Sequence, residues 1–258
     1  MRVDLKDKII VITGGAGGIG KALAVRFLAE ACQQVVVVDI NSQLVDATAT
    51  ELGCVKITAD VSNNDDMKRV IDDVERNIGP IDLFCSNAGV GAAPSLDSPD
   101  SEWQLSWDVN VMSHMYAARH LVPRMVERGH GYFLITASAA GLLNQIGGAA
   151  YGTTKHAAIG FGEWLALTYA HKGIGVSMLC PQAVRTAMTA NADPSVAAAS
   201  VDGMMEPADL AEVVVEGLRE EGFLILPHLE VLDYMRIKSS DYDRWIAGMN
   251  RLHQKFIG

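Results

Sequence analysis

Two long polar side chains, Tyr151 and Lys155, are four positions apart in the stretch AAYGTTKHAA, where most of the other residues are small. On a helix, side chains four apart share one face, with Cβ atoms about 6 Å apart. A tyrosine has a pKa of about 10, but a cation about 4 Å away at an effective dielectric of about 20 contributes about 4 kcal/mol, or roughly three pKa units. We therefore expect the pKa of Tyr151 to be lowered, so that it can act as a general base. By itself the short pattern also fits a chance pair on a solvated face.

A glycine-rich stretch, TGGAGGIG at residues 13–20, lies between an apolar run and a helical pattern. Gly14, Gly18 and Gly20 fit G-x-x-x-G-x-G, and an overlapping set beginning at Gly15 fits G-x-G-x-x-G. Either set lets the backbone turn tightly and approach a pyrophosphate at a helix N-terminus. The stretch predicts a dinucleotide site whose contacts are Gly14, Gly17, Gly18, Ile19 and Gly20.

Asp39 ends the next apolar run, nineteen residues after Gly20. A carboxylate there can accept hydrogen bonds from both hydroxyls of an adenosine ribose, and it would repel a 2′-phosphate. Neither Gly15 nor Ile40 supplies a cation that could hold that phosphate. The pattern favours NAD over NADP.

Short apolar runs alternate with helical patterns along the whole chain. Most of the runs are continuous in Val, Ile and Leu, as in strands that are covered on both faces. Such repetition predicts one doubly wound domain over residues 1–258, with a parallel sheet between two helical layers. The expected strands are 8–13, 34–39, 54–58, 82–86, 132–137, 175–180 and 223–226, and the expected helices are 18–31, 41–51, 64–78, 101–128, 150–171 and 207–221.

Composition narrows the class of protein. The chain has 258 residues, 49% of them hydrophobic, and a net charge of -10, which disfavours nucleic acid or an anionic membrane as a partner. The four cysteines and seven histidines show no metal-ligand spacing, so no metal is expected. With no signal peptide and no apolar run of about 18 residues, we expect a cytoplasmic protein.

Further motifs follow in a fixed order: NAG at 87–89, Ser138, and then Y-x-x-x-K at 151–155. Together with the glycine stretch, this order resembles the classical short-chain dehydrogenase/reductase family over nearly the whole chain. The resemblance implies a seven-stranded Rossmann-type sheet, a nicotinamide cofactor, and chemistry at a carbonyl or alcohol carbon.

The resemblance also implies roles for single residues. Ser138 and Tyr151 would contact the reacting oxygen, Lys155 would hold the nicotinamide ribose, and Asn110 would anchor a water for proton relay. Positive charge on the oxidised nicotinamide would add to that of Lys155 in favouring the Tyr151 phenolate. The further cofactor contacts would be Asp60, Val61, Asn87, Ala88, Gly89, Pro181, Val184 and Thr186.

The substrate pocket is less well defined by the pattern. The family commonly has Pro-Gly after the sixth strand, whereas this chain has Pro181-Gln182, and Gln182 could face outward or contact the substrate. In this family, residues 186–206 would form a substrate lid, and their low polarity fits an apolar substrate. The expected substrate contacts are Ser138, Gln145, Tyr151, Gln182 and Met188.

The C-terminal extension, residues 227–258, contains an apolar stripe of Trp245, Met249, Leu252 and Phe256 at helical spacing. Residues 240–243 resemble a capping box at the start of this helix. The stripe could pack on its own subunit. Because family members are often dimers or tetramers, we expect a homotetramer in which the stripe contacts another subunit.

Three functions are open on these patterns. The first is an NAD-dependent dehydrogenase of a lipophilic, cyclic or aromatic secondary alcohol, such as a steroid or terpenoid. A 3-oxoacyl thioester reductase is the second, although Asp39 and the acidic surface count against it. The third is a regulatory protein that senses the cofactor without chemistry. A sensor needs no proton relay, so the presence of Asn110, Ser138, Tyr151 and Lys155 counts against this function.

Overall fold

A seven-stranded sheet forms the centre of the computed structural model, which describes residues 3–190 and 194–257. All strands are parallel, in the order β3-β2-β1-β4-β5-β6-β7. The seven predicted strands are confirmed to within one residue at each end. They are β1 (Ile9–Thr13), β2 (Gln34–Asp39), β3 (Val55–Thr58), β4 (Leu83–Ser86), β5 (Gly131–Thr136), β6 (Ile174–Leu179) and β7 (Leu224–Ile225).

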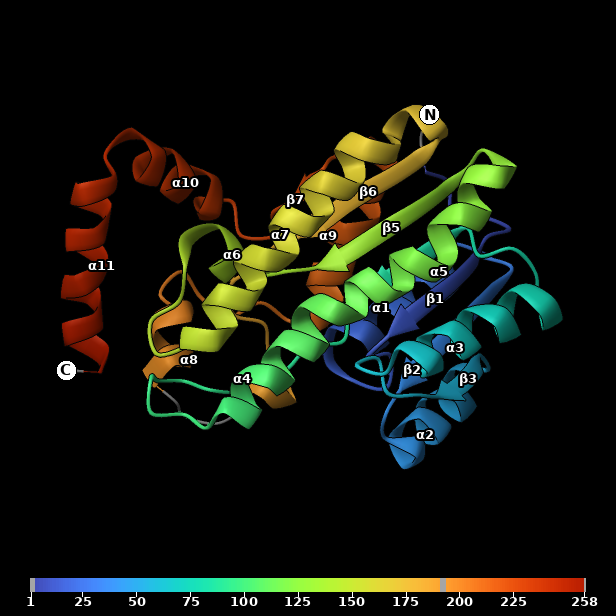
Figure 1. Ribbon diagram of the computed structural model, residues 1–258, viewed down its shortest axis with the longest axis horizontal. Helices are drawn as coiled ribbons and strands as arrows, with labels where there is room; N and C mark the ends of the chain where they lie inside the picture. The colour runs from blue at the N-terminus through green and yellow to red at the C-terminus, as the bar shows by residue number, and fades with distance from the viewer. Residues whose placement is uncertain (1–2, 191–193, 258) are drawn as a thin grey trace.

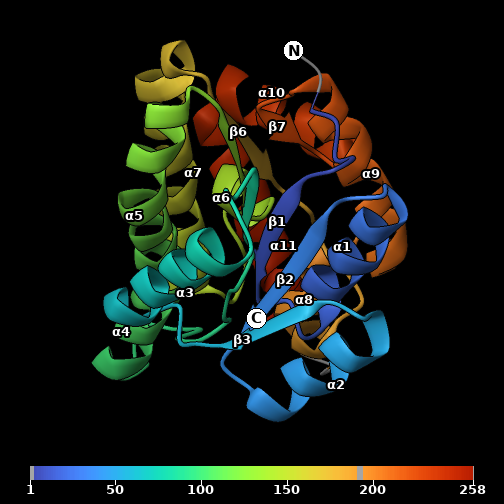
Figure 2. The ribbon, with the colours of Figure 1, turned by 90° about the vertical axis from the view of Figure 1, so that its right-hand side faces the viewer.

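Helices cover both faces of this sheet (Figure 1). One layer contains α1 (Gly18–Ala29), α2 (Ser42–Leu52) and α9 (Pro207–Glu220), and the other contains α3 (Asn64–Asn77), α5 (Ser113–Arg128) and α7 (Ala149–Tyr169) (Figure 2). The shorter helices are α4 (Asp100–Trp107), α6 (Ala140–Leu143) and α8 (Pro194–Ala199), with 3-10 turns at Ala170–Lys172 and Ala187–Thr189. Within the described residues, no helix is both long and apolar enough to cross a membrane.

The strands are apolar along their length because both of their faces are buried. In β1, Ile10 and Ile12 pack into the core under α1, and Ile9 and Val11 pack into the core under α3. Val11 lies opposite Val36 of β2 on one side and Phe84 of β4 on the other. A parallel sheet of this kind places all strand carboxyl ends, and the loops that follow them, at one edge, where ligands bind in such folds.

The single helix predicted over 101–128 contains an irregularity. Between α4 and α5 the chain forms one π-helical turn, Asp108–Met112, which includes the fully buried Asn110. Such turns are rare in proteins, and those that occur are often found at functional sites. The side chain of Asn110 is hydrogen-bonded to the backbone of Val90, twenty residues away in sequence. Helical periodicity depends on neighbouring residues, so it does not reveal a contact of this kind.

The C-terminal extension folds into a helical hairpin, α10 (Glu230–Ser240) and α11 (Tyr242–Phe256), beyond the carboxyl ends of β5 and β6 (Figure 1). The predicted capping box at Ser240 is wrong. Ser240 ends α10, where its hydroxyl donates to the Ile237 carbonyl, and Asp241 caps α11 by accepting a hydrogen bond from the Arg244 amide at 2.9 Å. The chain reverses at Asp241, so Ser240 is still helical and cannot serve as the cap.

Candidate active site

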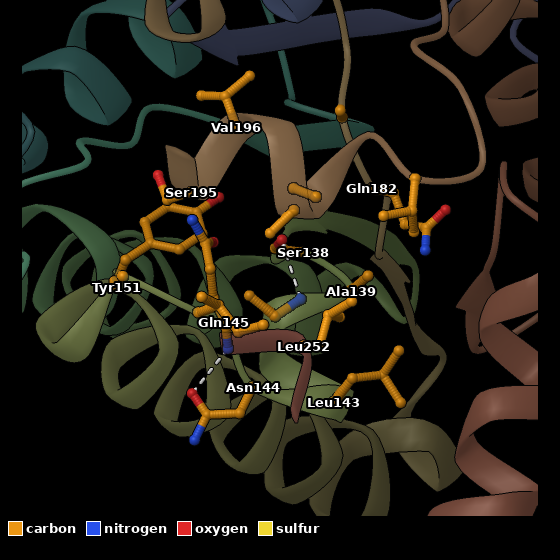
Figure 3. Close-up of a pocket in the computed structure, with 18 of the residues that line it drawn as sticks. Ser138, Ala139, Leu143, Asn144, Gln145, Tyr151, Gln182, Ser195, Val196 and Leu252 are labelled. Atoms are coloured by element: carbon orange, nitrogen blue, oxygen red, sulfur yellow. Dashed lines mark hydrogen bonds between the residues drawn. The ribbon is translucent and has the colours of Figure 1, made fainter. Parts of the chain in front are cut away.

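Tyr151, Lys155 and Ser138 meet at the carboxyl edge of the sheet. Tyr151 and Lys155 lie in the first two turns of α7, and Ser138 follows β5. The Lys155 ammonium lies 5.6 Å from the centre of the Tyr151 ring and donates to the Thr136 carbonyl at 3.0 Å. The Ser138 side chain lies beside the Tyr151 hydroxyl. Figure 3 shows Tyr151 and Ser138 at the same cavity, as a pair acting on one substrate oxygen requires.

Burial changes the electrostatics that the sequence suggested. Lys155 is only 3% exposed, and desolvation lowers its pKa to about 8. Burial also raises the pKa of Tyr151, and the hydrogen bond from Ser138 opposes this only in part. The expected lowering of the tyrosine pKa is therefore wrong for the protein alone, because loss of hydration outweighs the attraction of a cation 5.6 Å away.

The buried lysine predicts a pH-dependent stability. An unfolded lysine has a pKa of 10.5 and the folded Lys155 about 8, so the unfolded state binds more protons between these values and the free energy of unfolding rises with pH. Lys155→Met removes this titration. The variant should therefore unfold with a higher free energy than the wild type at the lower end of this pH range. We expect that difference in the free energy of unfolding to shrink by about 3 kcal/mol as the pH rises through the range. Denaturant unfolding of both cofactor-free proteins at several pH values measures the difference.

Lys172→Met is the matched control, because the exposed Lys172 ammonium also lies beside a tyrosine ring, 5.4 Å from the centre of Tyr169. Its stability difference from the wild type should stay constant over the same pH range. A constant difference for Lys155→Met as well would mean that Lys155 is not desolvated in the folded protein.

Asn110 lies beneath this group on the π turn. Its Nδ2 donates to the Val90 carbonyl at 2.9 Å and to the Thr154 hydroxyl at 3.1 Å, and its Oδ1 accepts from the Val90 amide at 2.9 Å. Both amide protons are thus used within the protein, and one lone pair of Oδ1 is left for the water that the family resemblance implies. Asn110 also holds the loop after β4 against α7.

The glycine-rich loop forms a tight cradle between β1 and α1. Gly14 has a φ of 63°, and a Cβ there would come within 2.9 Å of the Ala88 Cα. A Cβ at Gly20 would lie 2.1 Å from the Gly14 carbonyl oxygen. Gly17, by contrast, faces open space directly before the first residue of α1. The loop is packed on its inner side and open at the helix N-terminus, so it fits a pyrophosphate group.

The acidic candidates lie at the ends of β2 and β3. Asp39 is partly exposed and accepts from the Ala16 amide at 3.3 Å and the Asn41 amide at 3.1 Å, so its carboxylate lies beside the glycine-rich loop. Asp60 accepts from the amide and hydroxyl of Ser62. Val61 is only 8% exposed and packs into the core. Asp39 is thus the carboxylate that contacts the glycine-rich loop.

The remaining cofactor candidates connect strand ends. Asn87 donates to the Thr13 carbonyl at 3.0 Å and accepts from the Thr136 hydroxyl at 3.0 Å, which joins β1, β4 and β5. On the other side of the loop, the methyl group of Thr186 would lie 3.1 Å from a Cβ at Gly18. The other candidates of this group are Ala88 and Gly89 after β4 and Pro181 and Val184 after β6, all of them at the carboxyl edge of the sheet.

A cavity of about 730 Å³ opens over Tyr151 and Ser138. All five predicted substrate contacts line it, including Gln145, Gln182 and Met188. The predicted lid, residues 186–206, contributes Met188, Thr189 and six residues of the 195–202 stretch, whereas its residues 191–193 lie outside the described part of the chain. Lining residues that the sequence patterns did not indicate include Leu143, Ile146 and Tyr234.

The apolar stripe of α11 faces this cavity. Trp245, Met249 and Leu252 line it from the same chain, and Trp245 also packs 6.4 Å from the ring of Tyr234. The sequence leaves two roles open for the stripe, packing on its own subunit and contact with another subunit. In the structure the stripe forms the roof of the chain's own pocket, because α10 leads the chain back over α6 and α8 (Figure 1). The contact with another subunit stays a prediction. The stripe itself was the signal for this role, but its partner could not be read from helical spacing.

Comparison with known proteins agrees with this geometry. Residues 8–197 match the short chain dehydrogenase family profile. The chain is 36% identical over 192 residues to 3beta-hydroxysteroid dehydrogenase 2 of Eggerthella lenta, covering 70% of this chain and 73% of that protein. It is 31% identical to 1-deoxy-11-beta-hydroxypentalenate dehydrogenase of Streptomyces exfoliatus over 94% and 91% of the two chains.

Among solved structures, the fold is similar to that of a short chain dehydrogenase/reductase from Burkholderia phymatum in complex with NAD. The TM-score is 0.85 at 27% sequence identity, and the alignment covers 93% of this chain and 96% of the other. With the profile match over most of the chain and the ordered motifs gathered at one edge of the sheet, the chain belongs to the short-chain dehydrogenase/reductase family of oxidoreductases.

Proposed function

We propose that the protein is an NAD-dependent dehydrogenase that interconverts a secondary alcohol and a ketone on a lipophilic cyclic or aromatic substrate. The observation that carries the proposal is a largely apolar cavity of about 730 Å³ with Tyr151 and Ser138 in its wall. Cavities of this size hold small organic molecules and orient them through a few polar groups. The steroid and terpenoid substrates named for the two relatives support the lipophilic class.

The residues of the site divide the chemistry between them. Bound NAD would supply the hydride acceptor. Ser138 would hold the substrate oxygen by a hydrogen bond, and Tyr151 would take the hydroxyl proton as the carbon–hydrogen bond breaks. Because burial raises the pKa of Tyr151 even with Lys155 beside the ring, the phenol needs further positive charge before it can lose its own proton, and the oxidised nicotinamide of bound NAD would add to that of Lys155. In the reverse direction, Tyr151 would return the proton to the carbonyl oxygen.

NAD is favoured over NADP by the charges around the glycine-rich loop. The Asp39 carboxylate accepts a hydrogen bond from Ala16 of the loop, so it would lie near the ribose of a dinucleotide bound there, and the neighbouring Ile40 is exposed and uncharged. Lys21, on the first turns of α1, is paired with Glu51 at 2.7 Å. A 2′-phosphate would therefore meet a negative charge with no free lysine from α1 beside it.

A screen of secondary alcohols with NAD tests this function directly. Formation of reduced cofactor is followed by absorbance for monocyclic, terpenoid and steroid alcohols, with primary alcohols of matched size as controls. We expect turnover of at least one polycyclic secondary alcohol and much lower turnover of the primary ones. Activity restricted to thioesters, or none with any alcohol, would overturn the proposal.

We further propose that residues 186–206 and α11 together form the substrate lid.

We also propose that the protein is a cytoplasmic homo-oligomer, a tetramer or a dimer. Exposed apolar side chains on the α4 and α7 helices support assembly, among them Trp107, Trp164 and the 84% exposed Leu167. The four cysteines are free, which fits a reducing compartment.

Leu167→Glu should lower the assembly state, because it places a charge on the apolar face of α7. The matched control is Leu44→Glu on α2, where the native leucine is 54% exposed and lies in the opposite helical layer. Light scattering over a range of concentrations measures both variants. A monomeric wild type, or an unchanged assembly of Leu167→Glu, would contradict the proposal.

A further inference from the structure

The substrate cavity has a second polar group away from the catalytic pair. Gln182 follows β6, Asp202 follows α8, and Tyr234 lies on α10, yet all three line the cavity that holds Tyr151. The Gln182 side-chain amide donates to Asp202 Oδ2 at 3.0 Å. The Tyr234 hydroxyl donates to the same carboxylate, 3.0 Å from Oδ1 and 3.1 Å from Oδ2. Figure 3 shows Gln182 across the cavity from Tyr151, with Ser138 between them.

The Asp202 carboxylate keeps capacity for a further hydrogen bond. A carboxylate offers about four lone-pair sites, and only two donors, one from Gln182 and one from Tyr234, occupy them. Among the described residues, no lysine, arginine or histidine forms an ion pair with it. Asp202 is also exposed toward solvent and cavity in the protein without substrate. Because it lies in the cavity lining, the carboxylate can accept a hydrogen bond from a bound ligand in place of water.

The surrounding residues hold this carboxylate in place. The backbone amide of Gln182 donates to Nδ1 of the buried His228 at 3.2 Å, which anchors the segment after β6. Tyr234 packs against Trp245 of the roof. Burial raises the pKa of the Tyr234 hydroxyl, and its bond to Asp202 raises it further, so the phenol stays a donor. The two donors to Asp202 are thus each held in place, Gln182 by His228 and Tyr234 by Trp245.

We propose that Asp202, held by Gln182 and Tyr234, binds a hydroxyl group at the far end of the substrate. The inference rests on the proposed function and narrows it: the preferred substrate is a lipophilic ring compound with the reacting secondary alcohol at one end and a second hydroxyl at the other. Asp202 and its two donors then determine specificity, and Tyr151 and Ser138 carry out the reaction.

Charge and polarity favour a hydroxyl over other groups. A substrate carboxylate would be repelled by Asp202. An ammonium group would be attracted by Asp202, but it would lose water to a cavity lined by side chains such as Val196 and Leu252, and Lys255 in the same lining would repel it. A hydroxyl is neutral and donates one hydrogen bond, so it satisfies the carboxylate without adding a charge.

The test compares matched substrates with the full-length protein and NAD. One is a tetracyclic steroid with a single secondary alcohol on its first ring, and the other carries an additional hydroxyl on its last ring. We expect the dihydroxy steroid to have a kcat/KM about 10- to 100-fold higher, mainly through KM, because hydrogen bonds to charged groups have about that strength. Analogues with an amine or a carboxylate on the last ring should be no better than the monohydroxy compound.

Asp202→Asn should bring the two steroids to within about threefold of each other, mainly by lowering kcat/KM for the dihydroxy compound. Tyr234→Phe should reduce the preference less, because the carboxylate remains. Asp233→Asn, on α10 beside Tyr234 and paired with Arg236 at the surface, is the matched control and should leave the preference unchanged.

Three results would overturn the inference: no preference in the wild type, a preference that survives Asp202→Asn, or an equal loss of activity on both steroids in Asp202→Asn. An equal loss on both steroids would mean that Asp202, Gln182 and Tyr234 only hold the lid against α10 and do not bind the second hydroxyl. If no alcohol is oxidised at all, the proposed function fails instead, and calorimetric binding of the two steroids to the NAD-saturated protein still measures the hydroxyl preference. Equal dissociation constants in that measurement also refute it.

Discussion

Tyr151→Phe is expected to remove at least about 100-fold of turnover while changing the NAD dissociation constant by no more than a few-fold. General base catalysis contributes about 10² to 10⁴-fold, and the phenylalanine lacks only the hydroxyl. The glycine-rich loop and Asp39 do not contact this hydroxyl, so the dinucleotide site should be kept. Steady-state rates and a binding titration of the same preparation measure both quantities.

Tyr169→Phe provides the comparison, because Tyr169 is at the other end of α7, where its ring packs edge-on against Trp164. This control should keep nearly wild-type turnover. If Tyr151→Phe retains turnover within about tenfold of the wild type, Tyr151 is not the base. A large loss of NAD binding would instead show that the variant disturbs the cofactor site, which the geometry of α7 does not predict.

The second large effect concerns cofactor choice. We expect kcat/KM with NAD to exceed that with NADP by at least about 100-fold, which corresponds to about 2.7 kcal/mol. A 2′-phosphate next to the partly exposed Asp39 carboxylate would be repelled, and a repulsion of this size is reasonable at short range and intermediate dielectric. Asp39→Ala should narrow the gap by weakening NAD and improving NADP.

Asp46→Ala separates this local effect from a general loss of negative charge. Asp46 lies in the second turn of α2 and is paired with Lys56 at 2.6 Å. Its removal should leave the cofactor ratio unchanged. Equal efficiencies of the wild type with both cofactors would show that Asp39 does not select NAD.

Sequence by itself determined the sheet and the order of its parts. Strands such as β1 and β2 are apolar on both faces and bounded by glycine or charged residues, so local composition already identifies them and implies helical cover. The glycine-rich loop, Asp39 and the pair of Tyr151 and Lys155 are recognisable from local sequence, and Ser138 from the order of the family's motifs. Each needs only a fixed position relative to a strand end or a helix face, and the chain encodes that position locally.

Only the tertiary structure decided the electrostatics and the walls of the pocket. The pKa of Tyr151 depends on how completely the packed chain removes water, which a spacing of four residues does not state. The π turn at Asn110 depends on a bond to Val90, twenty residues away in sequence. The roof formed by α11 and the Asp202 carboxylate between Gln182 and Tyr234 join segments that are distant along the chain. Periodicity reports which face of a helix is apolar, but its partner is set by the path of the chain through the whole fold.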